Sequence, residues 1–213
     1  MAVVPPAYPA RLSIDYPATL DRATTAFRIF TVIPILIVLG AISNGSITSG
    51  GAEQERAAWQ SGGGLAVLFV PVLLMLLFRQ KYPRWWFDWN LAFTRFGARV
   101  AAYLLLLRDE YPSTDEEQAV HLDLDYPDAK NDLNRWLPLV KWFLAIPHYV
   151  VLVFLGLAVF FVVIVAWFAI LFTGTYPRDL FNFVVGVMRW GLRVEAYAFL
   201  LITDRYPPFS LSE

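Results

Sequence analysis

Apolar and polar residues alternate along the chain in long blocks, and the apolar blocks predict membrane-spanning helices. A span needs about 20 mostly apolar residues. The first two candidates cover about 26–43 and 63–78, and the polar stretch 44–62 between them is predicted to be a solvated loop. A third block, 137–172, has Lys141 as its only charge.

The block 137–172 is too long for one straight span. A helix over it would reach about 54 Å, whereas the hydrocarbon core of a bilayer is about 30 Å thick. We therefore expect a break near Gly156, with helices over about 137–155 and 157–172. The alternative is a helix in the membrane interface that ends at Pro147, followed by one longer span.

Two amphipathic segments, 84–107 and 178–202, follow the apolar blocks. In both, polar side chains recur at intervals of four, seven and four residues, which places them on one helical face. They are Arg84, Asp88, Arg95 and Arg99 in the first and Arg178, Asn182, Arg189 and Arg193 in the second. Aromatic residues beside a basic stripe are typical of a helix in the headgroup layer, whose arginines bind lipid phosphate. The alternatives are buried helices whose arginines pair within the protein, and further spans that would make the halves inverted repeats.

Strict alternation of apolar and polar residues predicts two short strands, at about 12–16 and 120–126. Period two indicates half-buried strands, and two strands alone form a marginal sheet. We expect a small cytoplasmic β element that must be covered by further strands, by a helix on the membrane surface or by a second subunit. Residues near 103–107 and 197–203 could supply the further strands.

The same landmarks occur twice along the chain, in the same order. The pairs are Asp15-Tyr16-Pro17 and Asp125-Tyr126-Pro127, Ile33-Pro34 and Ile146-Pro147, and Tyr82-Pro83-Arg84 and Tyr176-Pro177-Arg178. We therefore expect a tandem duplicated unit, with one membrane repeat over 1–112 and the other over 113–213. Each would consist of a strand, a transmembrane hairpin and an amphipathic interfacial helix. The predicted fold class is a mainly α integral membrane protein with four spans and a small cytoplasmic β element.

Composition and charge add a location and an orientation. Hydrophobic residues make up 58% of the chain and charged residues 16%, against about 45–50% and about 25% in a typical soluble domain. The net charge of −1 provides no global basic field for nucleic acid. Of the 17 Lys and Arg residues, only Arg56 falls in the loop assigned to the outer side. By the positive-inside rule we expect a multi-pass protein of the bacterial inner membrane with both termini in the cytoplasm.

The chain shows no catalytic constellation, and we expect no enzyme activity, cofactor or metal. It has no cysteine, and neither His121 nor His148 has a second ligand at metal-binding spacing. Lys141, His148 and Glu195 are the candidates for a polar pathway. The candidates for binding lipid headgroups are Arg84, Arg95, Arg99, Arg178, Arg189 and Arg193.

The Asp-Tyr-Pro strand, the apolar hairpin, the Tyr-Pro-Arg step and the Arg-x-Gly-x-Arg helix together resemble a bacterial membrane family of actinobacterial type. That family is known only as a domain of unknown function. The resemblance covers nearly the whole chain as two units and implies no reaction and no catalytic residue. The second unit has Asp179-Leu180 where the first has Trp85-Trp86, so the two need not be functionally equivalent.

These observations favour a non-enzymatic membrane accessory or scaffold protein that contacts lipids and does not bind nucleic acid. It would assemble with itself or with a larger membrane complex. One alternative is a channel or transporter for an ion or a small solute. A second alternative is an anionic-lipid-binding protein that uses the arginines of the two amphipathic segments.

Overall fold

The computed structural model describes residues 8–44 and 63–212. Within them the chain forms seven helices and two strands. In chain order these are β1 (Ala10–Ile14), α1 (Arg22–Thr31), α2 (Ile33–Asn44), α4 (Gly63–Arg79), α5 (Arg84–Leu104), β2 (Val120–Leu124), α6 (Pro138–Leu144), α7 (Ile146–Thr173) and α8 (Arg178–Ala198).

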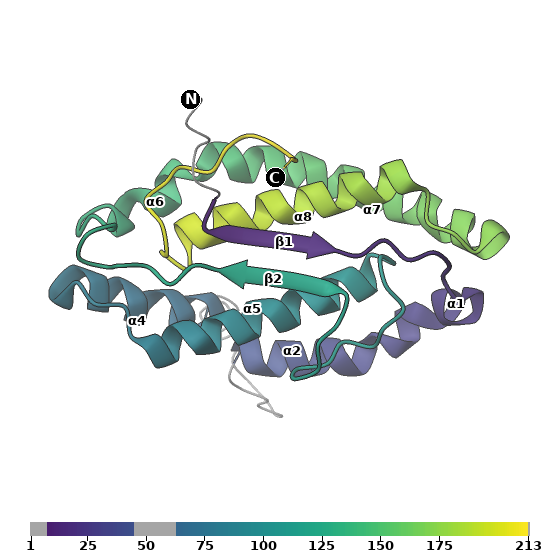
Figure 1. Ribbon diagram of the computed structural model, residues 1–213, viewed down its shortest axis with the longest axis horizontal. Coiled ribbons are helices and arrows are strands. Elements are labelled where there is room, and N and C mark those ends of the chain that lie inside the picture. Colours follow the sequence, from purple (N-terminus) through teal and green to yellow (C-terminus); the bar gives the residue numbers. More distant parts are fainter. Residues whose placement is uncertain (1–7, 45–62, 213) are drawn as a thin grey trace, which may run out of the picture.

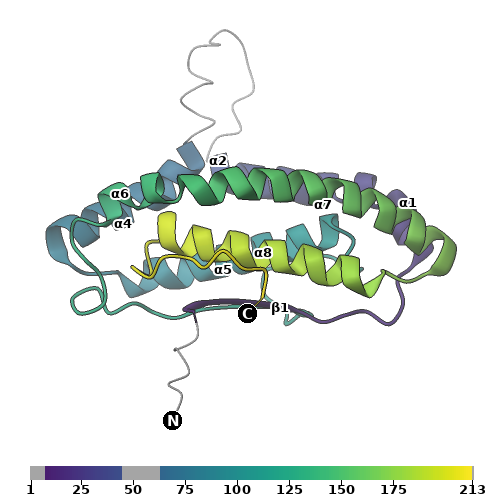
Figure 2. The ribbon, with the colours of Figure 1, turned by 90° about the horizontal axis from the view of Figure 1, so that it is seen from above.

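These elements form three stacked layers (Figures 1 and 2). Helices α1, α2, α4, α6 and α7 form the outer layer, α5 and α8 form the middle layer, and the sheet closes the opposite side. Helix α7 packs on α8, α8 packs on β1, and α5 packs on β2. The main core therefore lies between the strands and the helices, with apolar residues from all three layers.

The sheet is antiparallel, with Leu12 opposite Leu122. Burial alternates residue by residue along both strands, because successive side chains point to opposite faces of a sheet. The two strands predicted from the alternation are confirmed, although each ends slightly earlier than expected. The further strands predicted at 103–107 and 197–203 do not form, and α5 and α8 cover the buried face of the sheet instead.

The prediction of four membrane spans is wrong. Among the described residues only α7 is long and apolar enough to cross a membrane, with 28 residues and a mean hydropathy of 3.1 in its most apolar stretch. The block 137–172 breaks at Ala145, beside Pro147, and not near Gly156. Proline is tolerated in a first helical turn because its missing N–H would have no intrahelical partner there. A single glycine inside a helix costs only about 1 kcal/mol, so α7 continues through Gly156.

The first half of the chain contains shorter apolar helices. The predicted span 26–43 is divided at Val32 into α1 and α2, and α4 has 17 residues. None of these three reaches the length of about 20 residues that a span needs. The loop predicted for 44–62, including Arg56, lies outside the described residues except for Asn44.

Matching motifs of the two halves make matching contacts, and these contacts cross between the halves. Arg95 of α5 donates from Nε to the carbonyl of Leu122 at 2.8 Å, and Arg189 of α8 donates from Nε to the carbonyl of Leu12 at 2.7 Å. Each strand thus packs on the amphipathic helix of the other half. Helices α5 and α8 lie in the middle layer with arginines paired inside the protein, which is the first of the alternatives to a headgroup-layer helix.

The two ends of the molecule are built around matching tyrosines. At one end, which we call the Tyr82 end, α4 turns into α5 and the hydroxyl of Tyr126 donates to the carbonyl of Tyr82. At the other, the Tyr176 end, α7 turns into α8 and the hydroxyl of Tyr16 donates to the carbonyl of Tyr176. The two turns lie at opposite ends of the long axis (Figure 1).

Candidate functional site

Large apolar side chains are exposed on every helix of the outer layer. A folded monomer in water rarely exposes contiguous apolar patches larger than a few hundred Å². The most exposed are Phe27, Phe30, Ile37, Phe78, Phe143, Val153, Phe154, Leu157, Phe160, Phe161, Val165 and Phe172. We call the outer side of this layer the apolar face.

Helix α7 shows most clearly that one side of an outer-layer helix is exposed while the other is buried. The exposed residues Val153, Phe160 and Phe168 share one side of the helix. Ala166 and Ile170 are fully buried on the side that faces the rest of the protein. Only 11% of the most apolar stretch of α7 is buried within the protein. A helix that is apolar all round belongs in a core or in a membrane, and no described element covers the outer side of α7.

Aromatic and cationic side chains lie at the margin of the apolar face. Trp136, which precedes α6, and Trp142 on α6 are exposed. Arg79 and Lys81 are exposed where α4 ends. Tryptophan rings are enriched at membrane–water interfaces. Long basic side chains can lie along apolar surface while their charge reaches water or phosphate.

The opposite side of the molecule is polar. On the outer face of the sheet, Arg11 pairs with Asp125 at 2.7 Å and Arg95 pairs with Asp123 at 2.8 Å. The linker 109–132, which contains β2, carries nine acidic residues and a single Lys. The molecule therefore has an apolar face with basic residues at its margin and, on the other side, a polar face rich in acids.

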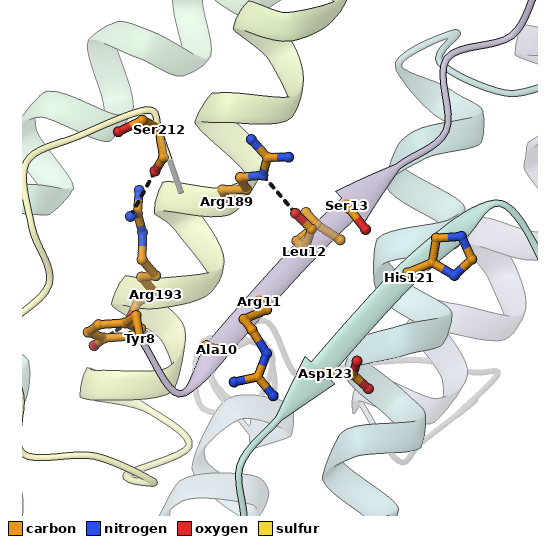
Figure 3. Close-up of a pocket in the computed structure, with 10 residues that line it drawn as sticks. All are labelled: Tyr8, Ala10, Arg11, Leu12, Ser13, His121, Asp123, Arg189, Arg193 and Ser212. Atoms are coloured by element: carbon orange, nitrogen blue, oxygen red, sulfur yellow. Dashed lines mark hydrogen bonds between the residues drawn. The ribbon is translucent and has the colours of Figure 1, made fainter. Parts of the chain in front are cut away.

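A pocket of about 360 Å³ lies on this polar side, between β1, α8 and the C-terminal segment (Figure 3). Arg193 is only 4% exposed and donates to the carbonyls of Ser210 and Ser212. Arg189, which also lines the pocket, donates to the carbonyl of Leu12. Both arginines therefore bind protein carbonyls on the side away from the apolar face.

The other four arginines predicted to bind lipid headgroups are not gathered into one site. Arg95 and Arg99 contact β2 and the linker that precedes it. Arg84 and Arg178 lie at the two ends of the molecule, each over a tyrosine ring, at 4.8 and 4.6 Å from the ring centroid. Lipid binding by this set stays a prediction.

The three residues proposed for a polar pathway hold the fold in different places. Lys141 is fully buried and pairs with Asp204 at 2.6 Å. His148 is fully buried and accepts a hydrogen bond from the indole of Trp190 at 3.0 Å. Glu195 lies on α8, where burial raises the pKa of its carboxyl group. None of the three lines the pocket beside β1 and α8.

Two buried ion pairs were not foreseen from the sequence. Arg28 of α1 pairs with Asp109, and its side chain is only 2% exposed. The pair of Lys141 and Asp204 occupies the matching place at the other end, and each cation also lies over a tyrosine ring. Arg28 and Lys141 both stand five residues before an Ile-Pro motif, so aligning the two halves would have revealed the correspondence.

These features define a three-layer protein with one apolar and one polar face, whose described residues contain no cluster of His, Cys, Asp and Glu suited to a metal ion. Residues 136–210, which include α6, α7 and α8, match the family described as Domain of unknown function (DUF4389). The expected likeness to an uncharacterised family is confirmed for this part of the chain, while the bacterial source stays a prediction. Searches of curated proteins and of solved structures found no match.

Proposed function

We propose that this protein is a non-enzymatic membrane protein that lies along one leaflet of a bilayer. Its apolar face would be immersed among the acyl chains, and its sheet would face the water. The supporting observation is the set of large apolar side chains exposed on every helix of the outer layer. Burial of apolar surface stabilises by about 25 cal/mol per Å², so a face of this kind strongly favours a lipid environment over water.

The arrangement of α7 supports a position along the membrane. A helix of 28 residues is about 42 Å long, longer than a hydrocarbon core of about 30 Å. Helix α8 packs alongside it and carries Arg189, Arg193 and Glu195. If α7 crossed the bilayer, α8 and its charges would be drawn into the hydrocarbon, which is costly. With α7 in the membrane plane, α8 stays at the water side of the outer layer.

Charge distribution favours lipid over a second copy of the chain as the occupant of the apolar face. Arg79 and Lys81 at its margin would be attracted to anionic headgroups, whereas the acids of the linker belong to the polar side. Exposed Trp136 and Trp142 suit the headgroup region in the same way. A second copy would offer neither phosphate nor a comparable interface for these side chains.

The polar side supports the accessory or scaffold role expected from the sequence. The paired charges on the sheet and the acidic linker would remain in water, available to a protein partner or to further copies. We further propose that the two halves arose by duplication of one unit, since their motifs make matching contacts. In a bacterial inner membrane, the sheet and both described ends of the chain would face the cytoplasm.

Flotation with phosphatidylcholine vesicles tests immersion of the apolar face. The protein should float, and Phe154→Glu with Phe161→Glu should lower partitioning by about 100-fold or more, since each phenylalanine contributes about 1.5–3 kcal/mol. Ser13→Glu with Thr114→Glu adds the same charge at exposed positions on the polar side and should leave flotation unchanged. Equal effects of the two pairs, or a soluble dimer that does not float, would overturn the proposal.

Depth measurements test the orientation. The chain has no cysteine, so single cysteines at Val150, Phe161 and Phe168 can carry nitroxide labels along the exposed side of α7. A helix in the membrane plane places the three labels at similar depth. A helix that crosses the bilayer would place the middle label deepest and make the outer two accessible from opposite sides.

A further inference from the structure

A groove at the Tyr82 end is lined by several basic side chains and lies beside the apolar face. It has a volume of about 640 Å³ and lies between the turn that joins α4 to α5 and the segment that leaves β2. Arg79 and Lys81 line one side, and Lys130 lines the other. The groove thus brings together basic residues that lie far apart in the sequence.

The cations of this groove are available to a ligand. Arg79 and Lys81 are both exposed, and neither pairs with a carboxylate within the described part of the chain. The one acid in the lining is Asp128. Its carboxylate accepts from the backbone N–H groups of Lys130 and Asn131 and from the Asn131 side chain at 2.6 Å. These hydrogen bonds lower the pKa of Asp128, so the carboxylate stays charged. They also engage its oxygens, which leaves them less available to the basic side chains of the groove.

The position of the groove indicates how deep in the membrane a bound ligand would lie. Arg79 is the last residue of α4 and follows Phe78, which is 69% exposed on the outer layer. Arg135 donates to the carbonyls of Leu77 and Phe78 and so fixes the end of α4. If the apolar face is immersed in acyl chains, the basic groups that follow it lie at the level of the lipid phosphates.

The Tyr176 end lacks this basic turn. Where the Tyr82 end has Arg79 and Lys81, the matching positions hold Thr173 and Thr175. The hydroxyl of Thr173 donates to the carbonyl of Ala169 at 2.7 Å and contacts the Thr175 hydroxyl at 3.0 Å. The basic turn is therefore specific to one end and does not follow from the shared backbone plan.

We infer that the groove at the Tyr82 end binds the phosphate of an anionic phospholipid. Arg79, Lys81 and Lys130 would surround the phosphate, and the acyl chains would lie beside α4. The inference rests on the proposed function, because it takes the immersed apolar face to set the depth of the groove. It adds a defined headgroup site to a surface that otherwise needs only apolar contacts.

Flotation with two vesicle compositions tests the site. The wild-type protein should partition more strongly into phosphatidylcholine vesicles that contain phosphatidylglycerol than into phosphatidylcholine alone. Arg79→Gln with Lys81→Gln should reduce this preference by about ten-fold or more. Arg11→Gln with Arg22→Gln removes the same charge at exposed positions outside the groove and serves as the matched control, with a loss below about three-fold. Equal losses for the two pairs, or no loss for Arg79→Gln with Lys81→Gln, would overturn the inference.

Two further readouts separate the inference from the proposed function and from other phosphate sources. Flotation with pure phosphatidylcholine should be the same for the wild type and both charge variants, and failure there would count against the proposed function instead. Titration of the detergent-solubilised protein with glycerol phosphate should show no saturable binding at concentrations where phosphatidylglycerol binds. Saturable binding of glycerol phosphate that Arg79→Gln with Lys81→Gln abolishes would assign the groove to a soluble phosphate and overturn the lipid assignment.

Discussion

At the Tyr82 end the chain turns through Arg79-Gln80-Lys81, whereas at the Tyr176 end the matching turn is Thr173-Gly174-Thr175. Both turns lead into a Tyr-Pro-Arg motif whose tyrosine is buried and whose arginine lies over a second tyrosine ring. The exposed positions differ in charge while the buried positions keep their role. The shared residues therefore build the fold, while the exposed ones give the two ends different surface charge.

Each end also contains a buried cation, and the two cations differ in chemistry. The Tyr176 end has Arg28 with Asp109, and the Tyr82 end has Lys141 with Asp204. A guanidinium stays charged under all ordinary conditions, whereas a buried lysine can lose its proton. The stability contributed by the buried ion pair can therefore depend on pH at the Tyr82 end and not at the Tyr176 end.

Removing the carboxylates should give the largest effects on stability. Asp109→Ala and Asp204→Ala should each lower the free energy of unfolding by about 3–5 kcal/mol at neutral pH, because each leaves a buried cation without its counter-ion. Denaturant unfolding in mild detergent, followed by tryptophan fluorescence, measures the difference. Asp88→Ala removes the partner of an exposed pair with Arg84 and is the control, with a change below about 1 kcal/mol.

The pH dependence of these two variants should differ. Burial lowers the pKa of Lys141, and Asp204 opposes that shift. Without Asp204 the folded-state pKa falls further below the unfolded value of about 10.4. Between these two values the unfolded state binds more protons, so the free energy of unfolding rises with pH. The stability lost in Asp204→Ala should therefore become smaller as the pH rises toward 10, while the loss in Asp109→Ala should stay constant, since a guanidinium is not deprotonated in proteins. Parallel pH profiles would contradict this distinction.

The buried tyrosine hydroxyls should give the next largest effect. Tyr82 donates to the carbonyl of Leu200 at 2.9 Å, whereas the buried hydroxyl of Tyr176 has no hydrogen-bond partner among the described residues. Tyr82→Phe leaves a buried carbonyl unsatisfied and should lower the free energy of unfolding by about 1–3 kcal/mol. Tyr176→Phe removes an unsatisfied group and should leave stability unchanged or raise it. The same unfolding measurement applies, and equal losses for the two variants would show that the two ends do not differ in this way.

Backbone conformation at the two turns predicts opposite effects of about 1 kcal/mol. Gly174 has a φ of 76°, which glycine adopts at no steric cost, and Gln80 has a φ of 45° at the matching position. Gln80→Gly should therefore raise the melting temperature and Gly174→Ala should lower it. Added at Gly174, a Cβ would lie 3.6 Å from Nε of Arg22, an ordinary contact, so the loss would come from the backbone. Changes of the same sign would exclude this account.

The smallest effect on stability is expected at the exposed basic turn. Arg79→Gln with Lys81→Gln should change the free energy of unfolding by less than about 0.5 kcal/mol, as is usual for surface substitutions. Thermal unfolding in detergent checks this directly. A larger loss would show that these side chains support the fold, and their effect on lipid preference would then need the charge-preserving variant Arg79→Lys as a further control.

The sequence predicted the local elements well where a single physical rule applies. Alternation located both strands, because a half-buried strand exposes every second side chain. The spacing of polar residues predicted helices over 84–107 and 178–202, and α5 and α8 begin at the first residue of each range. The arginine spacing identified one face of each helix, although it did not reveal that Arg95 and Arg189 meet strand carbonyls.

The prediction of four membrane spans was wrong because hydropathy reports how apolar a segment is and not how its helix is oriented. The block 137–172 is equally apolar whether α7 crosses a bilayer or lies beside α8. In the structure α7 packs on α8, and α8 packs on β1, which hydropathy alone does not reveal. The break at Ala145 was similarly ambiguous, because proline at position 147 is compatible both with a kink and with a helix start.

By itself, the sequence determined that much of this chain is apolar, that it contains two strands and two amphipathic helices, and that the motifs recur. These are properties of residue spacing, and backbone geometry translates spacing directly into elements. Only the tertiary structure decided that each strand packs on the amphipathic helix of the other half and that the apolar helices share one layer. It also decided that many basic side chains bind groups within the protein, among them Arg28, Arg95, Arg99, Arg189, Arg193 and Lys141. Such contacts join residues far apart in the chain, and their free energy depends on which surfaces meet, which no local pattern encodes.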